Sequence, residues 1–209
     1  MTSATPNFGQ FPLSSPMHAA IEAAVYRTPT PIQAETIDAA LAGHDVIGTA
    51  QTGTGKTAAF IIPIVERLRS APGTEPHGNA LILAPTRELA EQTHQWALRF
   101  GCGLRSALVV GGVAYGPQIN ALRGHPSIIV ATPGRLVDHL DRGTLSLKDL
   151  RILVLDEADR MLDMGFKPQL DRIMRALPSA PTPRQTLLFS ATLPPDLGTL
   201  VRLHLRKQL

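Results

Sequence analysis

The sequence has few of the residues that support thiol, metal-cluster or membrane chemistry. Cysteine occurs once in 209 residues, as Cys102, which excludes an internal disulfide and a cysteine-ligated metal cluster. No apolar run approaches the roughly 20 residues that a membrane helix needs. Residues 1–15 also lack the basic start and apolar middle of a signal peptide. We therefore expect a cytoplasmic protein with no membrane partner.

What is present describes a globular chain with a mild positive charge. With 209 residues, the chain is long enough for one large or two small domains with a sizeable core. Hydrophobic residues make up 44% of it and charged residues 18%, as in globular proteins. The net charge is +3, with 16 arginines and only four lysines. This balance mildly favours a polyanionic partner, although an ordinary solvated surface is the alternative.

Short continuous apolar runs predict strands that are buried on both faces. They lie at 46–49, 80–84, 107–110, 128–131, 152–155 and 186–189. Segments of helical length lie between and after them, at 56–69, 88–100, 116–123, 135–142, 168–177 and 195–205. The alternation predicts an α/β fold with a central parallel sheet and helices on both faces. Pro63 falls inside the first of these helices, where we expect a kink.

The most informative segment is the glycine-rich stretch that follows the first predicted strand. Residues 45–57 run from an apolar strand through a turn to Lys56 and Thr57, in the pattern of a Walker A loop with Ala50 at the first glycine position. Backbone N–H groups can converge on a phosphate where glycines replace side chains. A chance loop is the alternative. The predicted nucleotide contacts are Gln51, Thr52, Gly53, Thr54, Gly55, Lys56 and Thr57.

Polar clusters follow the other predicted strands at the same end. They are Pro85-Thr86-Arg87-Glu88-Leu89-Ala90, Gly111-Gly112, Thr132-Pro133-Gly134-Arg135, Asp156-Glu157-Ala158-Asp159 and Ser190-Ala191-Thr192. Open parallel sheets bind ligands beyond the carboxyl ends of their strands. The clusters therefore predict one continuous site along that edge.

These motifs, in this order, resemble the first RecA-like domain of the DEAD-box family of ATP-dependent RNA helicases. The resemblance covers nearly the whole chain and implies ATP and Mg²⁺ as ligands. It implies a RecA-like domain at 34–209, preceded by an extension at 1–33 that carries a Q motif and packs on the core.

The acidic motif has both a physical and a family-based interpretation. Asp156 follows four apolar residues, so its carboxylate is expected at a strand tip beside the phosphate loop, where it and Thr57 can hold Mg²⁺. The resemblance implies that Glu157 positions the attacking water, and that Asp159, Ser190 and Thr192 couple hydrolysis to strand separation. A solvated acidic cluster at a helix start is the alternative.

Residues 26–33 resemble the Q motif, which selects adenine. The amide of Gln33 can pair with N6 and N7 of adenine at once. The resemblance adds Arg27 to the nucleotide site and suggests that Phe8 stacks on the base, although Phe8 could instead pack on the domain. Val25 stands where the family has glycine, which puts the local turn in doubt because a β-branched residue disfavours positive φ.

Nucleic-acid contact is expected from the remaining strand ends. Arg87 and Arg135 can contact backbone phosphates, unless Arg87 forms a structural salt bridge instead. RNA rather than DNA is implied by the resemblance alone. The full predicted set is Pro85, Thr86, Arg87, Gly111, Gly112, Thr132, Pro133, Gly134 and Arg135.

The family's second RecA-like domain, which supplies arginine fingers, has no counterpart before Leu209. We expect this chain to bind nucleotide weakly and to hydrolyse little ATP alone, because an arginine finger is worth about 10³ to 10⁵ in rate. Two other classes stay open: a DNA-directed ATPase of the same superfamily, and a binding module without catalysis.

Overall fold

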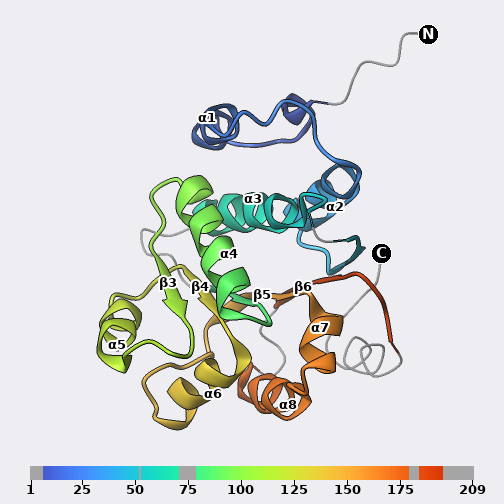
Figure 1. Cartoon of the computed structure of the whole chain (residues 1–209). Helices are drawn as coiled ribbons and strands as arrows, with labels where there is room; N and C mark the ends of the chain where they lie inside the picture. The colour runs from blue at the N-terminus through green and yellow to red at the C-terminus, as the bar shows by residue number, and fades with distance from the viewer. Residues whose placement is uncertain (1–6, 52, 71–78, 179–183, 195–209) are drawn as a thin grey trace, which may run out of the picture.

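The computed structural model describes residues 7–51, 53–70, 79–178 and 184–194 of the chain (Figure 1). Its centre is a six-stranded sheet in the order β1-β6-β5-β2-β4-β3, and every neighbouring pair is parallel. The strands are β1 (Val46–Thr49), β2 (Asn79–Leu83), β3 (Ser106–Val109), β4 (Ile128–Ala131), β5 (Leu150–Asp156) and β6 (Gln185–Ser190). All six predicted strands are confirmed, with limits that move by at most two residues.

Helices connect and precede these strands. They are the 3₁₀ turn η1 (Phe8–Gln10), α1 (Ser15–Ala23), α2 (Pro31–Leu41), α3 (Lys56–Arg69), α4 (Arg87–Phe100), α5 (Tyr115–Arg123), α6 (Pro133–Asp141), α7 (Ala158–Asp163) and α8 (Lys167–Ala176). The sequence did not predict η1, α1, α2 or α7. The helix expected at 195–205 lies outside the described residues. The α3 helix continues through Pro63.

Two apolar cores lie on opposite faces of the sheet. Ile82 and Val154 belong to the core that includes Phe60 of α3 and residues of α2 and α4. Their neighbours in sequence, such as Leu81, belong to the other core, with Leu136 of α6 and residues of α7 and α8. Because successive side chains of a strand point to opposite faces, a continuous apolar run supplies both cores. The prediction of a parallel sheet with helices on both faces is confirmed.

An aromatic cluster attaches the N-terminal segment to the domain. Tyr26 packs against Phe8, Trp96 and Phe100, with ring centroids 5.8 to 6.0 Å apart. Phe11 adds a contact to Phe8 at 6.0 Å. The cluster places η1 and α1 as an outer layer over α4, so most of the chain's few aromatic rings serve this one junction.

Polar contacts strengthen the same junction. The backbone N–H and hydroxyl of Ser14 donate to the two carboxylate oxygens of Glu66 in α3, at 3.0 and 2.7 Å. The expected domain boundary after Gln33 falls inside α2, which packs extensively on α3.

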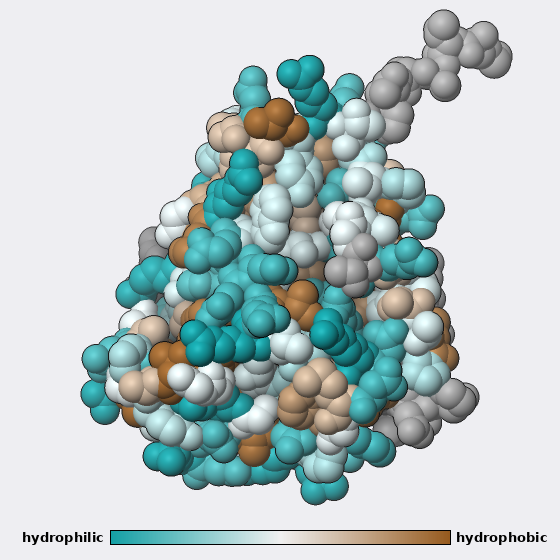
Figure 2. Space-filling model, in the orientation of Figure 1, coloured by the Kyte–Doolittle hydropathy of each residue, from teal (hydrophilic) through white to brown (hydrophobic). Residues whose placement is uncertain are grey.

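The face in Figure 2 is largely hydrophilic, with apolar residues in small separate patches. Among the described helices, none is long and apolar enough to cross a bilayer.

Candidate functional site

The phosphate loop connects β1 to α3 at the carboxyl edge of the sheet. Gly53 and Gly55 have φ values of 85° and 91°, in the left-handed region that side chains disfavour. A Cβ on Gly55 would lie 2.6 Å from Nε2 of Gln33, so this position has no room for a side chain. The Thr54 hydroxyl donates to the carbonyl of Gln51 at 2.7 Å and closes the turn. The loop therefore brings backbone N–H groups to the start of α3, the arrangement that binds phosphate.

Lys56 and Asp156 form the buried centre of the site. Each side chain belongs to a residue that is only 6% exposed, and Lys56 is the first residue of α3 while Asp156 is the last of β5. Neither Nζ of Lys56 nor Oδ1 of Asp156 has a hydrogen-bond partner among the described residues. Buried charged groups are normally paired, so these two atoms have the properties of groups that await a ligand.

The electrostatics of Asp156 support this interpretation. Burial raises the pKa of Asp156 from 3.8 to about 6, the nearby Lys56 charge opposes that rise, and the Glu157 charge adds to it. A cation placed at the carboxylate would relieve the cost of its charge. The charged carboxylate of Asp156 is therefore more stable with a cation bound to it than without one.

The donor set fits Mg²⁺. Thr57 and Asp156 offer hard oxygens, and Mg²⁺ is usually held by one or two protein oxygens plus phosphate and water. No cluster of three or more His, Cys, Asp or Glu side chains that could hold a metal occurs among the described residues. A site that depends on substrate phosphates does not need such a cluster. The residues present are therefore suited to bind Mg²⁺ together with substrate phosphates.

Glu157 stands at a strained turn beside Asp156. It is 7% exposed and has φ 51° and ψ 51°, the left-handed conformation, as the N-cap of α7. Its Oε2 accepts a hydrogen bond from Nη1 of Arg160 at 3.1 Å. Left-handed non-glycine residues cost energy and are concentrated at functional sites. The turn places Glu157 next to Asp156 at the carboxyl edge of the sheet.

The predicted coupling residues do lie together. Oδ2 of Asp159 accepts from the backbone N–H and the hydroxyl of Thr192, at 2.8 and 2.9 Å. The backbone N–H of Asp159 donates to Oγ of Ser190 at 3.1 Å. Burial raises the pKa of Asp159, but the hydrogen bonds from Ser190, Thr192 and Arg160 outweigh it and lower the pKa overall. These contacts join the start of α7 to the end of β6.

Both polar groups of the Gln33 side chain are bound within the chain in this conformation. Gln33 is fully buried, its Oε1 accepts from the Thr30 backbone N–H at 2.9 Å, and its Nε2 donates to the Gly55 carbonyl at 3.0 Å. The side chain therefore closes the N-terminus of α2 and clamps the phosphate loop. No part of it faces solvent in this conformation, and its pairing with adenine stays a prediction.

Phe8 follows the packing alternative. It is 4% exposed and lies in the core against Phe11 and Tyr26, not on a surface where a base could stack. Arg27 is exposed. The doubt about the neighbouring turn was wrong, because Val25 adopts φ 61° and is 71% exposed. The turn is kept at the expense of backbone strain.

Arg87 takes part in a surface ion pair. Its Nε lies 2.7 Å from Oε1 of Glu91, and both side chains are about half exposed. The sequence left this alternative open. An exposed pair contributes about 0 to 1 kcal/mol, so a phosphate can displace the carboxylate. Thr86 caps α4 by accepting from the Leu89 N–H at 3.3 Å, and Pro85 is buried.

Arg135 is held inside the structure. Its side chain is 10% exposed, Nη1 donates to the Val113 carbonyl at 2.9 Å, and the guanidinium lies 4.1 Å from the centre of the Tyr115 ring. Tyr115 in turn donates to Oδ2 of Asp138 at 2.9 Å. Arg135 thus ties the loop after β3 to the start of α6. The i,i+3 spacing of Arg135 and Asp138 is a sequence signal for their pairing, whereas the sequence contained no signal for Tyr115 as a partner.

The remaining predicted contacts lie near the carboxyl ends of β3 and β4. Gly111 and Gly112 are exposed, and Thr132 and Gly134 are partly exposed where α6 begins, next to the buried Pro133. A Cβ at Gly111 or Gly134 would meet no atom within 4 Å, so both leave open surface. Thr52 lies outside the described residues.

Comparison with known proteins gives one family. The family model for DEAD/DEAH box helicases matches residues 30–200. The chain is 48% identical over 205 residues to "DEAD-box ATP-dependent RNA helicase 28" of Oryza sativa subsp. japonica, covering 96% of this chain and 25% of that protein. It is 47% identical over 192 residues to "ATP-dependent RNA helicase CshA" of Limosilactobacillus reuteri, covering 91% and 37%.

A solved structure agrees with the fold. The crystal structure of a DEAD box protein from the hyperthermophile Methanococcus jannaschii superposes with a TM-score of 0.87 at 38% identity. It covers 97% of this chain and 55% of that one. The chain thus spans about a quarter to somewhat over half of the length of these proteins.

Proposed function

The chain belongs to the DEAD/DEAH box helicase family, and from that premise we propose that it is the nucleotide-binding half of an ATP-dependent RNA helicase. ATP binds at the carboxyl edge of β1, β5 and β6, and one strand of RNA binds along the ends of β2, β3 and β4. The single observation that carries the proposal is the buried Lys56 and Asp156 beside the phosphate loop, each with an atom that lacks a partner among the described residues.

Each group has a chemical task. The loop N–H groups and Lys56 hold the β and γ phosphates, and Thr57 and Asp156 hold Mg²⁺. Bound Mg²⁺ neutralises charge that develops on the phosphates. Glu157 orients the attacking water, since phosphoryl transfer demands positioning more than covalent chemistry. Its carboxylate accepts a hydrogen bond from Arg160, which limits its conformations.

RNA binding is proposed to be independent of sequence. The exposed groups on this part of the edge are backbone N–H groups, hydroxyls and Arg87, which suit phosphate and sugar contacts and do not read bases. The preference for RNA comes from the names of the relatives. We propose that the hydrogen bonds from Thr192 to Asp159, just beyond the ends of β6 and β5, couple hydrolysis to strand separation.

Hydrolysis at a useful rate is proposed to need a second RecA-like domain. The relatives named above are two to four times longer than this chain, which leaves room for such a domain. Arginine fingers from it would contact the γ phosphate and raise the rate about 10³- to 10⁵-fold. Closure of the two domains around ATP and RNA would separate a short duplex locally, because both ligands gain contacts only in the closed state.

Titration calorimetry with Mg²⁺ and a non-hydrolysable ATP analogue tests the nucleotide site. Lys56→Met should weaken binding at least tenfold, because it removes the buried charge that faces the phosphates. Lys148→Met, at an exposed lysine on the opposite edge, is the matched control and should leave the affinity unchanged. Equal affinities of the wild type and Lys56→Met would refute the proposed nucleotide site.

A second measurement tests Glu157 in the full-length protein. Glu157→Gln should retain ATP and RNA binding but lose most RNA-stimulated phosphate release. Unchanged hydrolysis would leave only a nucleotide-regulated binding module.

A further inference from the structure

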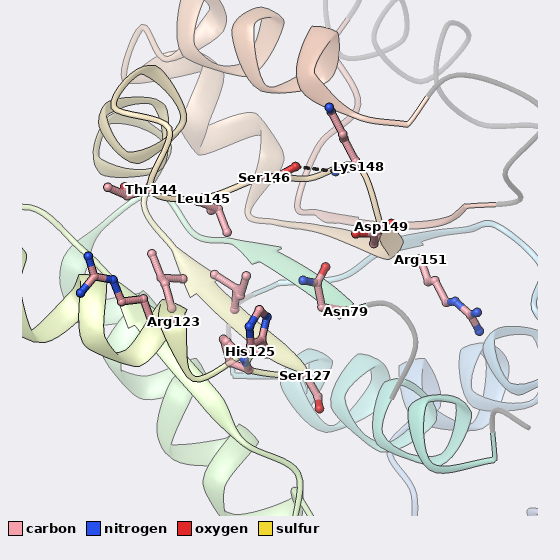
Figure 3. Close-up of a pocket in the computed structure, with 13 residues that line it drawn as sticks. Asn79, Arg123, His125, Ser127, Thr144, Leu145, Ser146, Lys148, Asp149 and Arg151 are labelled. Carbon is pink, nitrogen blue, oxygen red and sulfur yellow. Dashed lines mark hydrogen bonds between the residues drawn. The ribbon is translucent and has the colours of Figure 1, made fainter. Parts of the chain in front are cut away.

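A second concave site lies at the opposite, amino edge of the sheet (Figure 3). Its volume is about 750 Å³. The loop between α5 and β4 and the loop between α6 and β5 form its walls, and Asn79 and Arg151 line it from the first residues of β2 and β5. Because all the strands are parallel, this edge faces away from the phosphate loop. We call it the basic hollow, lined by Asn79, Leu122, Arg123, His125, Pro126, Ser127, Ile129, Thr144, Leu145, Ser146, Lys148, Asp149 and Arg151.

The rim of the basic hollow is rich in positive charge. Arg123, Lys148 and Arg151 are exposed, and the lining holds one carboxylate, that of Asp149. None of these three cations has a salt bridge within the described part of the chain, whereas Arg87, Lys167 and Arg172 elsewhere do. His125 adds a group that becomes a cation when protonated. The excess of cations predicts an anionic occupant.

The interior of the basic hollow, unlike its rim, is mainly apolar. Leu122, Ile129 and Pro126 are buried and supply an apolar floor. Asn79 stands among the lining side chains in Figure 3, and its Oδ1 has no hydrogen-bond partner among the described residues. Oδ1 is an acceptor, so an occupant that satisfies it must carry an N–H or O–H donor. A peptide backbone has an N–H at nearly every residue.

The lining also distinguishes a peptide from single-stranded RNA. Non-specific RNA sites combine cations with aromatic rings on which bases stack, and the lining residues include no aromatic ring other than the imidazole of His125. Cations around an aliphatic floor suit a segment in which acidic and aliphatic residues alternate.

We propose that the basic hollow is a docking site for an extended acidic peptide segment of a partner protein. Carboxylates of the peptide lie beside Arg123, Lys148 and Arg151, an aliphatic side chain rests on Leu122, and a backbone N–H donates to Asn79. The site is separate from the nucleotide edge, so a partner docks there without blocking ATP or RNA.

Nuclear magnetic resonance of the ¹⁵N-labelled chain tests the proposal. The probe is an eight-residue capped peptide of alternating Asp-Glu-Leu composition, and the control peptide replaces its acids by Asn and Gln. The acidic peptide should shift the amide signals of Asn79, Ser127 and Lys148 in a saturable way, with weaker binding at higher salt. The control peptide should bind at least tenfold more weakly. No saturable shift, or shifts confined to the carboxyl edge, would overturn the proposal.

Charge reversal locates the interaction. The double variant Lys148→Glu with Arg151→Glu should weaken peptide binding about tenfold or more, because two attractions become repulsions. The matched control is Lys167→Glu with Arg172→Glu on α8, which should retain the affinity. Equal weakening in both variants would mean that only net charge matters, and would overturn a specific site.

Two further arms complete the experiment. If the reversed variant loses signal dispersion, the milder Lys148→Gln with Arg151→Gln is used, with about threefold weaker binding expected. A twelve-nucleotide oligouridylate should leave the amides of Asn79 and Ser127 unshifted. Tighter binding of that RNA than of the peptide at these amides would replace the peptide by a nucleic acid and refute the proposal.

Discussion

Asp156 should destabilise the chain when neither metal nor nucleotide is bound. The rise of its pKa from 3.8 to about 6 is a shift of roughly two units, and each unit corresponds to about 1.4 kcal/mol, so the charged form costs about 3 kcal/mol. Asp156→Asn keeps the shape of the side chain and removes its charge. We expect this variant to raise the free energy of unfolding by about 3 kcal/mol at pH 8. The attraction to Lys56 is already contained in this figure, because it opposes the pKa rise.

The pH dependence identifies the cause. A folded-state pKa above the unfolded value means that the stabilising, protonated form is complete below pH 4 and is lost as the pH rises through about 6. The advantage of Asp156→Asn should therefore be full at pH 8, about half as large near pH 5, and small near pH 4. A packing effect of the substitution would instead be constant with pH.

Urea unfolding with a chelator present measures the difference at pH 5 and pH 8. Asp163→Asn, at an exposed carboxylate in the last turn of α7, is the matched control and should change stability by less than about 0.5 kcal/mol. Adding Mg²⁺ and nucleotide should stabilise the wild type more than Asp156→Asn, because the variant loses a metal ligand. A variant that is less stable than the wild type at pH 8, or equally improved at both pH values, would refute the reasoning.

Three further predictions concern backbone and coupling. Val25→Gly should raise the free energy of unfolding by about 1 kcal/mol, because the relief of strain at φ 61° exceeds the cost of the more flexible unfolded chain. Thermal unfolding measures this, and a less stable variant would contradict it. Gly55→Ala should destabilise the chain by about 2 kcal/mol and Gly53→Ala by about 1, because both glycines have positive φ but only a Cβ at position 55 would collide with Gln33. Equal losses of stability in chemical unfolding would contradict the contact of Gln33 with the phosphate loop. The wild type should be more stable than Asp159→Asn at pH 7. In acid unfolding measurements this difference in stability should shrink as the pH falls below about 4 and through the lowered pKa of Asp159. A difference that grew in acid would be inconsistent with that pKa.

Local sequence patterns were reliable where burial is continuous. The strand at 46–49 and the helix at 56–69 have the predicted limits, since an apolar run followed by a glycine turn leaves few alternatives. The short helices α1 and α2 were missed; isolated helices of this length are marginal, and tertiary packing decides whether such segments become helical. Val25 was misjudged because surrounding contacts hold a backbone conformation that its own preference disfavours.

Side-chain partners were harder to predict than positions. Gln33 was chosen for its paired donor and acceptor, and the structure uses both, but on Thr30 and Gly55 of the same chain. Arg135 was chosen for its charge, and the structure surrounds it with Tyr115 and Asp138. The contacts with Thr30 and Asp138 are local ones, a capping box and an i,i+3 pair, whereas those with Gly55 and Tyr115 depend on how α2, α5 and α6 pack.

The sequence by itself determined the α/β alternation and which polar residues follow each strand, because the order of residues along a chain places a motif at a strand end wherever that strand lies. Only the tertiary structure decided that the ends of β1 and β5 stand on either side of β6, about 100 residues apart in sequence, with Lys56 and Asp156 buried near each other. It alone also created the basic hollow at the other edge. Both arrangements depend on strand order, and strand order is set by the packing of two cores in which every strand takes part.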